Sequence, residues 1–466
     1  MGLTLRKRRC DGDESRSGAR TVIIGAGDAG RSVARALRLT EGALTPVGFI
    51  DDAPSGEMVL GLPVLGGTTD IAGATWSIRA QVVVVAIPSL PPAGVARLIE
   101  RACAAGLDVR YVPPGAAAAT EPLRLLGRDE LIVAGTRARR FVSGRRVLVT
   151  GACGMVGARL CRRLRTLRPA TLIQLDNDED ALARLTAEST TGRAAMVDIR
   201  ERPQVEELFE RTRPELVLHA AGFNHDPGPL ERQPCAAVRT NVLGTRNLVR
   251  AAVRQDVERF VLVSTDQAAE PVSVLGATRR LAELVLQAEA GGPTCFAAVR
   301  VGSVLGAGDS PLDAIAGQLA AGRPITVAHP DAARHLMSAR EAAELVLEAT
   351  AMAEDAETFA LDTGPPASVL EAVGALIDGL RVPDATIRFT GLGPGERLRA
   401  RSFADSEERV RTAHPLIYAT RATAPAHGRN EPVVALLDAA ARDADDEVRA
   451  LMRRILPEYR PRGERP

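Results

Sequence analysis

The chain has 466 residues, of which 45% are hydrophobic and 25% charged, and its net charge is +1. This length exceeds one ordinary core and predicts two or three domains. The near-neutral charge argues against a nucleic acid or an acidic membrane surface as a partner. Six scattered cysteines, with no C-x-x-C pair and no paired histidines, indicate a reducing compartment and no metal site. No apolar run approaches the ~20 residues of a membrane helix, so we expect a cytoplasmic protein with no membrane span.

Two segments repeat a pattern of apolar strand, glycine-rich turn and amphipathic helix. They read TVIIGAGDAGRSVARALR (21–38) and RRVLVTGACGMVGARLCRRLR (145–165), and each leads to a second strand that ends in acid. Two such openings predict an α/β protein with two tandem Rossmann-like domains, each a doubly wound parallel sheet. The expected division is a disordered tail at 1–19, a first domain at 20–122, a connector at 123–144 and a second domain at 145–466.

The second domain changes character along its length. Apolar strands and helical stretches alternate as far as about residue 305, which predicts a nucleotide-binding core at 145–305. Beyond this point proline and glycine interrupt the pattern, as in GRPITVAHPD and TGLGPGERL. We therefore expect residues 306–466 to form a smaller substrate-binding subdomain over the strand ends.

The glycine turn of the second domain predicts a dinucleotide site. Gly151, Gly154 and Gly157 follow the pattern T-G-x-x-G-x-x-G between strand and helix. Glycines there allow a tight turn and let the backbone approach a pyrophosphate at the helix N-terminus, although a purely structural turn is the alternative. Asp176 ends the next strand, where a carboxylate can accept the adenosine ribose hydroxyls. The acids that follow it would repel a 2′-phosphate, which favours NAD over NADP. Asp198 is placed either to contact the adenine edge or to cap a loop or helix.

The first domain carries its own glycine turn. Gly25, Gly27 and Gly30 form G-x-G-x-x-G, and Asp51 follows the second strand. These residues are candidates for nucleotide binding, but the domain offers no catalytic group. A purely structural or regulatory role is the alternative interpretation.

The ordered motifs resemble a known family. They include GFIDD, GLPVLGGTTDI, LLGRDEL, RRVLVTGACGMVG, RPELVLHAAGFNHDP, AVRTNVLGTRNL, VERFVLVSTDQAAEPVSVLGATRRLAE, PITVAHPDAARHLM and FTGLGPGERL. Together they cover about 20–460 and resemble the CapD-type polysaccharide-biosynthesis proteins. Those are UDP-N-acetylglucosamine 4,6-dehydratases of the extended short-chain dehydrogenase/reductase class. Larger relatives carry membrane helices ahead of the first nucleotide-type domain, so this chain is expected to be a soluble form.

The resemblance implies a reaction and its catalytic residues. The family oxidises a sugar at C4 with NAD(P)⁺, eliminates water across C5 and C6, and returns the hydride to C6. Asp266 matches the family's acid, and Thr265 matches the neighbour that bonds the 4-hydroxyl. Gln267 stands where the family has the lysine base for C5, Leu275 where it has tyrosine or methionine, and Arg279 where a lysine holds the nicotinamide ribose. An amide cannot abstract a proton, and arginine is effectively never deprotonated.

The resemblance also implies substrate-binding residues. His225, Ser303, Arg334 and Glu396 fall on matching motifs, although Ser303 replaces an asparagine and the nearby Gly393 replaces an arginine that should meet the diphosphate. His225 is either a substitute proton carrier or an ordinary loop histidine.

Three interpretations of function remain open at this point. The first is an NAD-dependent nucleotide-sugar enzyme of the lyase or isomerase class whose reaction has drifted from 4,6-dehydration, for example toward epimerisation. The second is an inactive homologue that binds NAD or a nucleotide sugar in a regulatory or partner role. The third is an ordinary dehydratase that tolerates Gln267 and Arg279. The first and third share a pathway, polysaccharide or glycoconjugate biosynthesis, and a substrate class, a UDP-linked amino sugar. A homo-oligomer is expected by analogy.

Overall fold

The chain forms two compact units, Met1–Glu121 and Pro122–Pro466. The computed structural model describes residues 19–27, 30–31, 33–34, 37, 44–52, 58–87, 90, 92–111, 136–187, 192–223, 227–305, 315, 317–318, 323–380, 386–421 and 430–461. Within these ranges no helix has the length and apolarity needed to cross a membrane.

The first unit is built on a four-stranded parallel sheet in the order β2-β1-β5-β6. The central strand β5 is four consecutive valines, all buried, as expected where both faces of a parallel sheet are covered. The elements are β1 (Ala19–Ile24), β2 (Leu44–Ile50), β3 (Met58–Val59), β4 (Leu62–Pro63), α2 (Ile71–Trp76), β5 (Val82–Val85), α3 (Pro92–Ala104) and β6 (Asp108–Tyr111).

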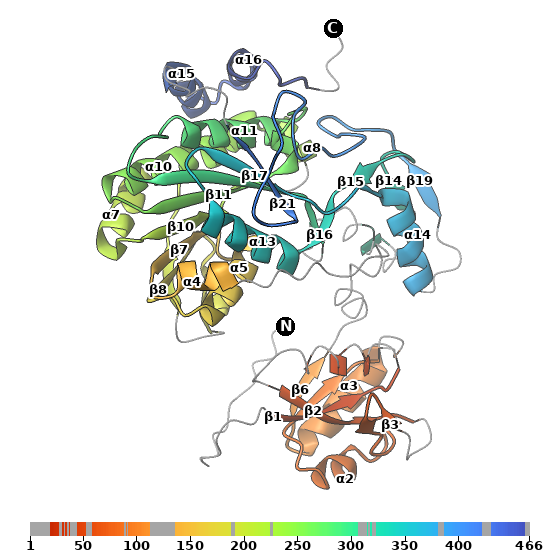
Figure 1. The fold of residues 1–466 in the computed structure, drawn as a ribbon. Coiled ribbons are helices and arrows are strands. Elements are labelled where there is room, and N and C mark those ends of the chain that lie inside the picture. The colour runs from red at the N-terminus through yellow and green to blue at the C-terminus, as the bar shows by residue number, and fades with distance from the viewer. Residues whose placement is uncertain are drawn as a thin grey trace. The chain divides into compact units, whose positions relative to one another are not determined.

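The second unit contains a nine-stranded sheet in the order β20-β21-β17-β12-β11-β10-β7-β8-β9 (Figure 1). The seven strands from β17 to β9 are parallel, and β21 and β20 add an antiparallel edge. The strand order reverses between β7 and β10, so a crevice for a ligand is expected at the carboxyl ends of these strands. The strands are β7 (Arg146–Thr150), β8 (Thr171–Asp176), β9 (Gly192–Met196), β10 (Leu216–His219), β11 (Arg259–Thr265), β12 (Cys295–Val301), β17 (Glu357–Leu361), β20 (Val410–Arg411) and β21 (Ile417–Arg421).

Helices cover both faces of this sheet because successive strand residues point to opposite sides. In β11, Phe260 and Leu262 belong to one core, and Val261 and Val263 belong to the other. The first core is closed by α7 (Arg202–Thr212), α9 (Pro234–Val238), the π-helix η2 (Arg239–Leu243), α10 (Gly244–Arg254) and α11 (Val274–Gln287). The second core is closed by α4 (Thr136–Val142), α5 (Met155–Thr166), α6 (Glu179–Ala187) and α13 (Ala339–Met352).

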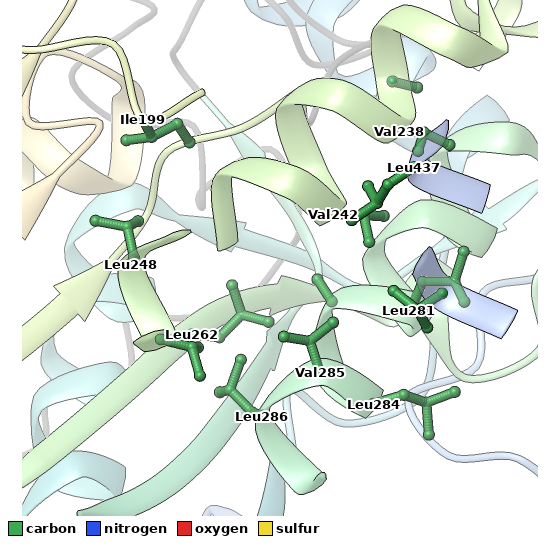
Figure 2. Packing of buried hydrophobic residues seen from close by; sticks show 14 of the residues in the cluster. Ile199, Val238, Val242, Leu248, Leu262, Leu281, Leu284, Val285, Leu286 and Leu437 are labelled. Carbon is green, nitrogen blue, oxygen red and sulfur yellow. The ribbon is translucent and has the colours of Figure 1, made fainter. Parts of the chain in front are cut away.

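A C-terminal helical hairpin, α15 (Asn430–Ala441) and α16 (Asp445–Ile455), completes the first of these cores. Figure 2 shows Leu437 of α15 beside Val238 and Val242, which come from α9 and η2. Arg239 of η2 adds a hydrogen bond to this contact, because its Nη1 donates to the Ala440 carbonyl of α15 at 2.6 Å. The hairpin thus packs on helices that lie about two hundred residues earlier in the sequence.

A small cap with its own core lies beside the large sheet. It comprises β13 (Ser303–Leu305), β14 (Ile325–Val327), β15 (Ala333–Arg334), β16 (Leu336–Ser338), β18 (Ala367–Ser368), α14 (Val369–Leu380) and β19 (Ile387–Phe389). The expected subdomain 306–466 is therefore not one continuous piece. The chain alternates between cap and sheet. After β16 it forms α13 and β17, then β18, α14 and β19 of the cap, and then β20 and β21 of the sheet. Apolar residues of α13, β17 and β21 fill the second core.

Candidate active site

The glycine turn of the second unit joins β7 to α5 and depends on two glycines. Gly151 has φ +63°, and a Cβ on it would lie 2.6 Å from the Ala221 backbone. A Cβ on Gly157 would lie 2.8 Å from the carbonyl carbon of Gly151 and closer still to its oxygen. Gly154 is the N-cap of α5 and makes no side-chain capping bond. The helix therefore starts without a side-chain acceptor for its first N–H groups, which suits an external anion.

Asp176 lies at the end of β8 and points back to this turn. Its Oδ2 accepts the Cys153 N–H at 2.8 Å, and its Oδ1 accepts the N–H groups of Asn177 and Asp178 at 2.9 and 3.3 Å. Three donors leave part of the carboxylate's acceptor capacity unused. The residues present at this end of the crevice thus fit the adenosine and pyrophosphate parts of a dinucleotide.

Asp198 follows β9 and is occupied within its own loop. Its two carboxylate oxygens accept from Arg200 Nε, each at 3.0 Å, and Oδ2 also accepts from Arg200 Nη2 at 2.5 Å. The hydrogen bond from Arg200 lowers the pKa of Asp198 against the opposing effect of burial. This geometry matches the loop interpretation, and an adenine contact by Asp198 stays a prediction.

The strand β11 ends in the residues that carry the expected chemistry. Thr265 and Asp266 are both 5% exposed, and Asp266 opens a short 3₁₀ helix, η3 (Asp266–Ala268). Thr265 Oγ1 donates to Asp266 Oδ1 at 3.3 Å. Among the residues that the structure describes, Asp266 Oδ2 has no hydrogen-bond partner. A buried carboxylate oxygen without a partner is costly, so this position is a candidate for a ligand contact.

Two arginines act on the charge of this carboxylate. Burial raises the pKa of Asp266 to about 6, and the charges of Arg334 and Arg397 and the Thr265 hydrogen bond oppose that rise. Arg334 lies on β15 between Asp266 and Glu396, whose charges counter the effect of burial on its own pKa. The structure therefore brings together Asp266, Arg334 and Glu396, as the sequence predicts, and adds Arg397, which sequence reasoning missed. Glu396 also accepts the Gly393 N–H at 2.8 Å.

Asp266→Asn is expected to stabilise the protein at pH 7 by about 1–3 kcal/mol. An acid whose pKa rises from 3.8 to about 6 on folding loses native stability as pH increases between those values. The amide removes this penalty, so the melting temperatures of variant and parent should converge near pH 4 and diverge by pH 7. Thermal unfolding at both pH values measures this, and a lower melting temperature for the variant at pH 7 would contradict it.

Arg279 is committed to backbone carbonyls at the ends of β10 and β11. Its Nε donates to Phe223 O at 3.1 Å, and its Nη1 lies 3.5 Å from both Ala221 O and Val263 O. Burial lowers the pKa of Arg279 to about 10, so the side chain stays charged at neutral pH. Arg279 therefore holds the loop after β10, a structural role that its position alone did not predict.

The two other altered positions offer no proton carrier. Leu275 is fully buried in the first core, and the Gln267 amide oxygen accepts from Ser273 Oγ at 3.4 Å. Ser273 also caps α11 by accepting the Gly276 N–H at 2.9 Å. The start of α11 is therefore built for packing and capping.

A fully buried histidine, His219 on β10, lies near the turn. Its Nδ1 is 2.7 Å from Thr150 Oγ1 and its Nε2 is 2.9 Å from Thr245 Oγ1. Thr245 donates its own proton to Asn241 O at 2.6 Å, so Nε2 must carry the histidine proton. Burial and then the charge of Arg279 lower the pKa of His219 to about 3. A neutral histidine held between two hydroxyls is a structural group, not an acid.

Beneath β11 lies a buried ion network that sequence reasoning missed. Glu283 of α11 accepts from Ser264 Oγ at 2.7 Å and from Arg300 Nε and Nη2 at 2.9 and 2.8 Å. Arg300 continues to Glu407 at 2.6 and 2.9 Å. The only sequence signal was a charge within each of two apolar runs. Because Ser264 precedes Thr265, this network fixes the backbone that presents the site.

The remaining predicted residues lie elsewhere. Ser303 begins β13, and its N–H donates to His335 O at 2.8 Å. His225 lies outside the described residues.

The first unit repeats the turn geometry of the second. Gly25 has φ +105°, and a Cβ on Gly30 would lie 2.8 Å from the carbonyl carbon of Gly25, whereas one on Gly27 would meet nothing within 4 Å. Asp51 Oδ2 accepts the Ala26 N–H at 2.5 Å. Both the ligand-binding and the structural interpretation use this turn, so nucleotide binding there stays a prediction.

Each of the two units matches a known protein family. Residues 147–422 match the family described as polysaccharide biosynthesis protein, and residues 20–89 match the PglD N-terminal domain. The probable polysaccharide biosynthesis protein EpsC of Bacillus subtilis (strain 168) is 31% identical over 447 residues, which is 91% of this chain and 73% of the relative. The capsular polysaccharide biosynthesis protein CapD of Staphylococcus aureus is 31% identical over 424 residues, which is 85% of this chain and 71% of the relative.

Solved structures share the fold of the second unit. Pen from Bacillus thuringiensis aligns with TM-score 0.57 and 26% identity over 61% of this chain and 90% of that one. A double mutant of DesIV, a dTDP-glucose 4,6-dehydratase from Streptomyces venezuelae with NAD and DAU bound, aligns with TM-score 0.50 and 22% identity over 56% of this chain and 88% of that one. Together with the family match over most of the second unit, this similarity establishes that the chain belongs to the polysaccharide biosynthesis protein family, with CapD and EpsC among its relatives.

Proposed function

We propose that the protein is an NAD-dependent enzyme that modifies a nucleotide sugar by 4,6-dehydration or epimerisation. The observation that carries the proposal is the buried Asp266 at the carboxyl end of β11, whose Oδ2 has no hydrogen-bond partner among the described residues. Family membership supports a nucleotide-sugar-modifying enzyme of polysaccharide biosynthesis. A related fold binds NAD in a dTDP-glucose 4,6-dehydratase.

The chain's own residues supply binding and orientation. The turn at Gly151, Gly154 and Gly157 would take the pyrophosphate, and Asp176 would take the adenosine ribose. When bound, NAD supplies reversible hydride removal at the sugar. Thr265 and Asp266 would meet the sugar hydroxyls, and Arg334 would counter the charge of the diphosphate. The acids after Asp176 favour NAD over NADP.

The test has two arms. Calorimetry with NAD and with NADP measures cofactor choice, and NMR follows UDP-N-acetylglucosamine after long incubation with protein and NAD. Tight NAD binding and a 4-keto or epimerised sugar are expected. The proposal would be overturned if the protein bound neither NAD nor NADP and formed no sugar product.

A second candidate function, a non-catalytic binding or regulatory protein, is favoured by the start of α11. Gln267 and Leu275 carry no titratable group, and Arg279 is committed to carbonyls. Bound NAD and sugar without turnover would support this candidate over the first.

Gln267→Lys combined with Arg279→Lys separates these functions. Gln267→Lys supplies a base that the amide lacks, and Arg279→Lys replaces one cation by the lysine that the family has at that position, so dehydratase turnover is expected to rise about 100-fold, since one acid–base group contributes on that order. Gln267→Met combined with the same Arg279→Lys change is the matched control, because methionine fills similar volume without a base. Equal rates for the lysine and methionine variants would contradict the expectation that proton transfer limits this site.

A further inference from the structure

Asp266 is the one described group at this strand end that combines burial with unused acceptor capacity. Its Oδ1 accepts a hydrogen bond from the Thr265 hydroxyl at 3.3 Å, while Oδ2 has no hydrogen-bond partner among the described residues. Two arginines, Arg334 and Arg397, act on the charge of this carboxylate and oppose the effect of its burial. A fixed carboxylate beside two cations can hold a negative charge and still keep one oxygen available for a substrate proton.

The other acids described around Asp266 are already engaged. Glu270 pairs with Arg397 at 3.7 Å and with Arg401 at 3.2 Å. Glu396 closes its own turn on the Gly393 N–H. Glu283 is saturated by Ser264, Arg280 and Arg300.

The described bases are engaged too. His219 lies between two threonine hydroxyls, and His335 faces the end of β17 with its Nδ1 3.3 Å from Thr363 Oγ1. The neighbouring Gln267 cannot accept a proton at neutral pH. The Asp266 carboxyl group is thus the one candidate among the described residues for two tasks. The resemblance to the family assigns these tasks to an acid and a separate lysine base.

We propose that Asp266 alone moves the proton of sugar C5: its carboxylate removes that proton next to a C4 ketone, and the resulting carboxyl group donates it to the departing C6 hydroxyl. This inference rests on the proposed function, and it names the group that replaces the absent lysine. Both protonation states of Asp266 are accessible near neutral pH, since burial raises its pKa to about 6.

The step balances without any further reactant. The C5–H bond breaks, the proton moves to Asp266 Oδ2, and the electron pair is delocalised onto the C4 oxygen as an enolate. The enolate then forms the C5=C6 bond as the C6–O bond breaks. The same proton passes from Asp266 to the leaving oxygen, so water departs and the carboxylate is restored. No electron is gained or lost between the ketone and the unsaturated ketone.

A partial reaction tests this role without hydride transfer. UDP-4-keto-6-deoxy-N-acetylglucosamine, prepared with an authentic dehydratase, is incubated with the protein in D₂O, and NMR follows loss of the C5 proton. The protein is expected to accelerate exchange, and Asp266→Asn should slow it by about 100-fold. The rate should rise with pH through about 6, because the charged carboxylate is the base. This profile is an independent readout that needs no variant.

The control is Asp405→Asn, which removes an exposed carboxylate from a nearby loop and should exchange at the parent rate. Calorimetry with the same keto sugar and thermal unfolding confirm that each variant binds and folds. The inference is overturned if Asp266→Asn exchanges the C5 proton at the parent rate. It is also overturned if the parent protein binds the keto sugar and dehydrates UDP-N-acetylglucosamine but exchanges the C5 proton no faster than the variant does. A parent protein that binds neither sugar overturns the proposed function as well, so the two failures are distinguishable.

Discussion

Arg300→Met is expected to destabilise the second unit by about 3–5 kcal/mol, because it strands two carboxylates in the interior. Arg300 and Glu283 are buried with fully inaccessible side chains, and Glu407 is 13% exposed. Methionine fills similar volume but donates no hydrogen bond. A fall in the melting temperature on the order of 10 °C should follow.

The matched control is Arg442→Met, which removes an ion pair with Glu447 whose side chains are 61% and 47% exposed. Exposed pairs contribute about 0–1 kcal/mol, so this variant should melt close to the parent. Equal melting temperatures for the two variants would mean that the buried network does not stabilise the fold.

Acid sensitivity gives a second readout of the same network. Against the effect of burial, the charges of Arg300 and Arg280 and the Ser264 hydrogen bond lower the pKa of Glu283 from 4.5 to about 2. A lowered native pKa contributes stability that is present above pH 4.5 and is lost as pH falls toward 2. Arg300→Met should weaken this dependence, which chemical unfolding across that pH range would reveal as a flatter slope.

Gly157→Ala is expected to abolish dinucleotide binding, with a loss of affinity of about 100-fold or more and destabilisation of about 1–3 kcal/mol. The added methyl group cannot be accommodated, since the backbone of Gly151 is rigid and lies well inside contact distance. Either α5 moves away from the turn or the turn itself opens. Both changes displace the N–H groups that would meet the pyrophosphate.

Gly292→Ala provides the comparison, because its Cβ would meet only Glu289 O at an ordinary 3.7 Å. Calorimetry with NAD and thermal unfolding distinguish the two substitutions. Parent affinity for NAD in Gly157→Ala would show that the dinucleotide is bound elsewhere.

The sequence predicted the features that depend on neighbours along the chain. Gly151 and Gly157 constrain a turn through their missing side chains, so the pattern alone indicated strand, turn and helix. Thr265 ends the seven-residue strand β11 and Asp266 follows it, and the apolar run FVLV within that strand placed both at a strand end. Alternation of strands and helices was enough to predict a parallel sheet, whereas its strand order and its antiparallel edge come from the structure.

What the sequence could not predict arises from contacts between distant residues. Glu407 meets Arg300 across 107 positions, and no periodicity links them. The raised pKa of Asp266 depends on burial that only the folded chain provides, and the role of Arg279 depends on where three carbonyls converge. The division at residue 305 failed to anticipate the return of β17 and β21 to the sheet, since short apolar strands look alike in cap and core.

The C-terminal hairpin has a consequence for how the chain acquires its structure. Arg239 donates a hydrogen bond to Asp443, which is 204 positions later in the chain. The N–H of Arg460 donates to Pro271 O at 3.1 Å. At ribosomal rates of roughly 5–20 residues per second, α9 and η2 stay uncovered for about 10–40 s after they emerge. During that interval an apolar helical surface is open to other chains. Yield in the cell should therefore depend on chaperone supply more than the stability of the finished protein suggests.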